Sequence, residues 1–117
     1  MATQHADLTD EAWSRYTPDR RILTIAAEMY RAGKRLAIGD LAEVKRGYER
    51  VLNLADLTRS VAASRGLRRE MARWRELVGA LYVSELPSRA DHDALLGVLL
   101  TFSPEAFLQR PYLLSGA

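Results

Sequence analysis

The sequence predicts an all-α protein: a compact helical bundle of four main helices plus one or two short terminal helices. Apolar residues recur at steps of three and four along most of the chain, and residues typical of helix ends separate these stretches. No segment alternates as a strand does. Since 117 residues suffice for one core, we expect a single helical domain over residues 1–117. The expected core contains Ile25, Met29, Val51, Met71, Trp74, Leu81 and Leu99.

Two helices are expected in the first third of the chain. Trp13 is the apolar anchor of a short helix within residues 8–16. Thr17 and Pro18 then start a longer helix, because proline at the first helical position needs no partner for its missing N–H and threonine accepts from a free backbone donor. Gly33 favours the left-handed conformation of a helix end, which predicts that this helix stops near residue 32.

The longest periodic stretch covers residues 40–86. Asp40 caps its start, and an apolar stripe that begins at Leu41 is joined later by a second stripe containing Leu54. A helix with two apolar faces is central to a bundle, or is buried on one side by a partner. The segment Ser64-Arg65-Gly66 interrupts the pattern, so one kinked helix and two packed helices both remain open.

The C-terminal third is strongly apolar. Ser88 caps a fourth main helix with apolar residues around its whole circumference, and Ser103 with Pro104 starts one more short helix. We expect the fourth helix to be buried, either by a protein partner or second copy, or by the other helices of the same chain. The candidate apolar interface consists of Leu95, Leu96, Leu99, Leu100, Phe102, Tyr112, Leu113 and Leu114.

The positive charges concentrate in the middle of the chain. The net charge is only +2, yet residues 41–86 hold nine basic and six acidic side chains. Arg65, Arg69 and Arg73 step by four and therefore share a helix face. Such a face is either an ordinary solvated one or a surface for nucleic acid or an acidic partner. The candidate residues are Arg46, Arg50, Arg65, Arg68, Arg69, Arg73 and Arg75.

The residue patterns of known catalytic and cofactor sites are missing. The sequence has no cysteine, no glycine-rich phosphate loop and no Gly-x-Ser-x-Gly turn. Neither His5 nor His92 follows a Glu at the spacing of a di-iron bundle, and the aspartates beside His92 fit a helix start. We therefore expect no enzyme activity, no cofactor, no metal and no small-molecule substrate.

The class of function that these observations leave is interaction with other macromolecules. We expect a non-catalytic helical interaction protein, acting as a subunit, adapter or assembly chaperone of a larger complex and self-associating. The alternative is a nucleic-acid-associated helical protein, either a small transcription regulator or a nucleoprotein subunit, that binds through the arginine-rich face. The absence of cysteine, of a signal peptide and of any apolar run long enough for a membrane span leads us to expect a cytoplasmic protein without a membrane partner.

Overall fold

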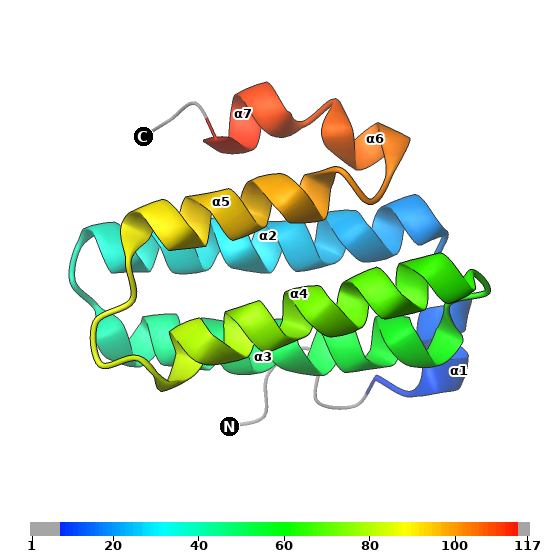
Figure 1. Ribbon diagram of the computed structural model, residues 1–117, viewed down its shortest axis with the longest axis horizontal. Helices are drawn as coiled ribbons and strands as arrows, with labels where there is room; N and C mark the ends of the chain where they lie inside the picture. The colour runs from blue at the N-terminus through cyan, green and yellow to red at the C-terminus, as the bar shows by residue number, and fades with distance from the viewer. Residues whose placement is uncertain (1–7, 115–117) are drawn as a thin grey trace.

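The computed structural model describes residues 8–114 and confirms the all-α bundle. Four long helices run up and down beside one another, each antiparallel to the one before it: α2 (Pro18–Ala37), α3 (Leu41–Val61), α4 (Arg65–Val83) and α5 (Arg89–Leu100) (Figure 1). Within residues 8–114, three short helices accompany them, where one or two were expected: α1 (Asp10–Ser14), α6 (Pro104–Phe107) and α7 (Arg110–Leu114). None of the helices described combines the length and apolarity needed to cross a membrane.

Side-chain oxygens define where the helices begin. Six helices start after a residue whose side chain accepts a hydrogen bond from the backbone N–H three residues on, which satisfies one of the free donors of the first turn. The capping residues are Thr9, Thr17, Asp40, Ser64, Ser88 and Ser103. The predicted starts at Thr17, Asp40, Ser88 and Ser103 are therefore confirmed.

The predicted end of the second helix was wrong. α2 continues through Gly33 to Ala37, and the left-handed conformation occurs at Gly39, with φ of 78°. Gly33 has another role: a Cβ there would lie 2.9 Å from Nε2 of His92 on α5. Glycine is present because two helices approach closely, and not because the backbone has to turn.

Residues 40–86 form two helices rather than one. The chain is extended at Ala62 and Ser64, which separates α3 from α4, and Ser64 caps α4 by accepting from the N–H of Leu67 at 3.1 Å. Gly66 lies within the first turn of α4 and does not break a helix. The two apolar faces of α3 are explained within the chain, because α3 packs against α1, α2 and α4.

The core lies where the four long helices face one another. All seven residues predicted for it are buried, and Trp13 of α1 joins them by donating its indole N–H to Oγ1 of Thr58 at 2.9 Å. α5 packs more extensively against α2 than against its sequence neighbour α4. The expectation that α5 would be buried all round is wrong, since Val98 is 46% exposed on its α4 side.

Candidate functional site

A groove between α4 and α5 exposes apolar side chains. One part, of about 470 Å³, is lined by Trp74, Leu77, Val98 and Phe102 together with polar residues at its end. A second part, of about 330 Å³, continues along the same two helices, and Leu77 lines both. Leu77 is 49% exposed, so the middle of the groove presents a leucine to solvent.

The groove exists because α5 packs mainly against α2. Figure 1 shows α4 and α5 running side by side in front of α3 and α2. Ala80 and Ala94 line the second part of the groove, and such short side chains leave the space between the two helices unfilled. The result is an apolar channel between two antiparallel helices, which is the kind of surface that receives another helix.

The two ends of the groove carry opposite charge. Arg69 and Arg73 line one end, beside Glu70, and Asp91 lines the other. Within residues 8–114, the side chains of Arg69, Arg73 and Asp91 have no ion-pair partner. Each of these charges faces solvent and is available to a molecule that occupies the groove.

The arginines that the sequence predicted to share one face lie at several separate places on the surface. Arg46 pairs with Glu43, Arg50 with buried Glu28, and Arg75 with Asp56. These three guanidinium groups are engaged within the chain. The Glu43 carboxylate has a pKa below its usual value because it accepts from the Arg46 guanidinium.

The remaining arginines lie on both sides of α4. Arg65, Arg68 and Arg69, joined by Arg59 of α3, line an open depression of about 600 Å³ between α3 and α4, whereas Arg73 faces α5. Arg68 is partly engaged, since it donates to the carbonyl of Ala62 at 2.7 Å. The basic surface is thus smaller than the sequence predicted.

The residues of the candidate apolar interface are also separated, some in the core and some on the surface. Leu96, Leu99 and Leu100 belong to the core and present no surface to a partner. The half-buried members pack against that core: Leu95, Phe102, Leu113 and Leu114. Tyr112 is 73% exposed on α7. Leu95 and Phe102 line the groove, while its central exposed residues, Leu77 and Val98, were not among the candidates.

A buried polar cluster connects α2, α3 and α5. His92 is fully buried, and its two nitrogens lie 2.9 Å from the carbonyl oxygen of Met29 and 2.7 Å from Oη of Tyr48. A carbonyl only accepts, so Nε2 carries the proton and Nδ1 accepts from the tyrosine hydroxyl. Burial lowers the pKa of His92 and raises that of Tyr48 to about 12, so both groups are neutral.

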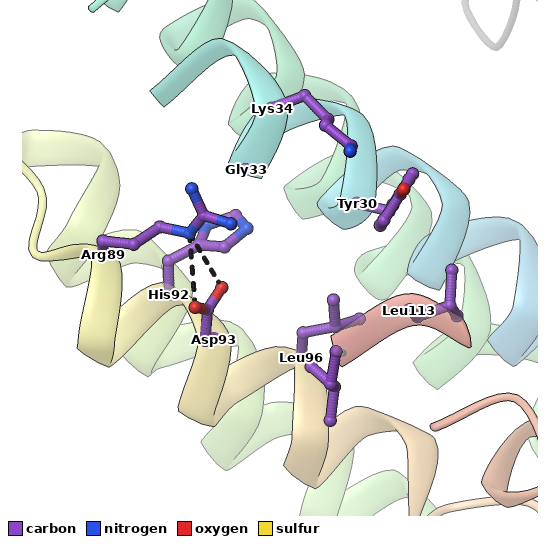
Figure 2. A pocket seen from close by; sticks show the side chains of 9 residues that line it. Tyr30, Gly33, Lys34, Arg89, His92, Asp93, Leu96 and Leu113 are labelled. Atoms are coloured by element: carbon purple, nitrogen blue, oxygen red, sulfur yellow. Dashed lines mark hydrogen bonds and ion pairs between the residues drawn. The ribbon is translucent and has the colours of Figure 1, made fainter. Parts of the chain in front are cut away.

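His92 is held in place and has no open site beside it. The adjacent cavity measures about 20 Å³, room for a single water molecule. Figure 2 shows Arg89 paired with Asp93 next to the imidazole, while Tyr30 and Lys34 stand across the cavity on α2. The sequence contained a signal for this burial: His92 precedes Leu96 and Leu99 by four and seven residues, the spacing of one helix face.

Neither metal ligands in the described residues nor similar proteins indicate a function for the chain. Over residues 8–114, no three His, Asp or Glu side chains are grouped as metal ligands would be; His5 lies outside the described residues. No protein-family model, curated protein or solved structure matches the chain. The function is therefore inferred from the geometry of the surface.

Proposed function

We propose that this protein is a non-catalytic helical interaction protein, a subunit, adapter or assembly chaperone of a larger complex, and that the α4–α5 groove is its binding surface. The observation that carries the proposal is the exposure of Leu77 and Val98 in a channel between two antiparallel helices. Apolar grooves of this form bind amphipathic helices, whose apolar faces fill them. The fully buried His92 supports a structural role, since both of its nitrogens are hydrogen-bonded inside the chain.

A capture experiment with matched variants tests this function. The tagged protein is used as bait in a lysate of its native host, with nuclease present, and the bound proteins are compared for wild type, Leu77→Asp and Val83→Asp. Both variants place a charge on an exposed apolar position of α4, but Val83 lies outside the groove. We expect a protein that wild type and Val83→Asp retain and that Leu77→Asp loses. Identical captures by all three baits would contradict the proposal.

The second candidate function is nucleic-acid binding. It is supported by Arg59, Arg65, Arg68 and Arg69 around the depression between α3 and α4, where Asp56 is the acidic residue of the lining. Phosphate contacts make affinity fall steeply with salt. Under this hypothesis, Arg65→Glu with Arg69→Glu abolishes binding to a mixed-sequence duplex at low salt, and Arg110→Glu on α7 does not. Equal affinity of all variants, or no binding at low salt, would refute it.

We also propose a cytoplasmic location. The support is the complete absence of cysteine from the 117 residues, because small domains exported to oxidising compartments commonly rely on disulfides. Fractionation of host cells with an antibody to the protein tests this location. Recovery in an exported fraction would contradict it.

A further inference from the structure

The α4–α5 groove is complementary to itself. Its centre is Leu77, which lines both parts of the groove. Arg69 and Arg73, with Glu70 beside them, give one end a net positive charge, and Asp91 makes the other end negative. A two-fold rotation about an axis through the centre exchanges the ends. Leucine would then face leucine, and each basic end would face an acidic end.

We propose that the occupant of this groove is a second copy of the chain, bound with two-fold symmetry so that Arg69 and Arg73 of each copy face Asp91 of the other. This inference rests on the proposed function, because it names the partner of the same groove. α4 and α5 of the two copies form a four-helix interface around the two leucines. The arrangement gives an ion-pair partner to Arg69, Arg73 and Asp91, which are among the charged side chains that have none in the described part of the chain.

The charge pattern favours a second copy over other occupants. A nucleic acid would bring phosphates against Glu70 and Asp91 as well as against the arginines. A separate protein would need its own matching acidic and basic ends, whereas a copy of this chain has them by construction. The small side chains of Ala80 and Ala94, both exposed, allow two helices to approach closely beside the centre.

Sedimentation equilibrium on the purified full chain tests the contact at the centre. We expect wild type and Val83→Asp to dimerise with the same dissociation constant, and Leu77→Asp to raise that constant by at least about tenfold, because the symmetry places two buried aspartates together. Circular dichroism checks that each variant is folded. A wild type that remains monomeric up to millimolar concentration, or a Leu77→Asp that dimerises as well as wild type, would overturn the proposal.

Charge exchange tests the orientation. In a symmetric dimer of Arg73→Asp, each new aspartate faces Asp91 of the other copy, and in a dimer of Asp91→Arg each new arginine faces Arg73. Each change alone should therefore raise the dissociation constant by about tenfold. An equimolar mixture of the two variants restores both attractive pairs, and so does the double variant with itself. We expect the dissociation constants of the mixture and of the double variant to return to within about threefold of the wild-type value. Failure of both to recover would refute the two-fold arrangement.

The two proposals can fail separately. If the purified protein is monomeric but a lysate protein is lost specifically by Leu77→Asp, then the groove binds a different partner and the self-association proposal is wrong. If the chain dimerises as proposed and its own untagged copy is the only lysate protein whose capture depends on Leu77, then the adapter or subunit function of the groove is contradicted and the self-association stands.

Discussion

The close approach of α5 to Gly33 of α2 gives a sharp prediction for Gly33→Ala. Alanine normally stabilises a helix interior relative to glycine by up to about 1 kcal/mol. At this position, however, the new Cβ would lie 2.9 Å from Nε2 and 3.2 Å from Cδ2 of His92. The imidazole cannot move aside freely, because Tyr48 and Met29 hold it from both sides.

The overlap outweighs the helix-propensity gain. Forcing an extra methyl group into a packed interior costs about 1–3 kcal/mol, and weakening a buried hydrogen bond adds about 1 kcal/mol. After subtraction of the propensity gain, we expect Gly33→Ala to lower the free energy of unfolding by about 1–3 kcal/mol. For a chain of this size, that loss corresponds to a fall in Tm of about 5 °C or more.

Gly79→Ala is the matched control, since Gly79 also lies inside a long helix and a Cβ there meets no atom within 4 Å. We expect this change to raise the free energy of unfolding by about 0.5–1 kcal/mol. Urea denaturation followed by circular dichroism measures both variants. Opposite signs support the argument, and a Gly33→Ala variant as stable as wild type would refute it.

Three further changes test the buried polar groups. Burial holds the pKa of His92 below 6.5, so the free energy of unfolding falls as the pH drops below that value, by at most about 1.4 kcal/mol per pH unit. Urea unfolding at several pH values measures this dependence, and we expect His92→Gln to lack it. Glu28→Ala removes a buried carboxylate from two arginines and should lower the free energy of unfolding by about 2 kcal/mol. Glu43→Ala removes an exposed ion pair and should leave the Tm close to that of wild type, so thermal unfolding distinguishes the two variants. Trp13→Phe loses the indole hydrogen bond to Thr58 and should lower stability by about 1–2 kcal/mol, an effect that chemical denaturation detects and that a wild-type midpoint would contradict.

The helices could be predicted from the sequence because their determinants are local. A cap such as Thr17 or Ser88 and an apolar repeat such as Ile25 with Met29 act over one or two turns. The end of α2 could not be predicted in this way. Gly33 is required by His92, which lies on another helix far along the chain, and nothing near Gly33 in the sequence indicates that contact.

The surfaces were harder to predict because exposure depends on which helices pack together. The sequence showed that α5 is apolar around its circumference. It did not show that α5 would pack mainly against α2 and leave Val98 facing an open groove. In the same way, spacing placed Arg69 and Arg73 on one helix face, where both line the groove, but could not show that Arg69 also lines the depression between α3 and α4. The sequence does not distinguish the exposed Leu77 from a core leucine, because both occur in the same kind of apolar helix.

The packing of α5 on α2 also affects the order in which the chain folds. α2, α3 and α4 contact their neighbours in the sequence, so this part needs no long loop to close. The bond from His92 to Met29 instead joins residues 63 positions apart, and its loop-closure cost is smaller once the helices between them have folded. We expect α5, with α6 and α7, to dock late and to detach first in partial opening, so that amide hydrogens of α5 exchange with solvent faster than those at the centre of α3.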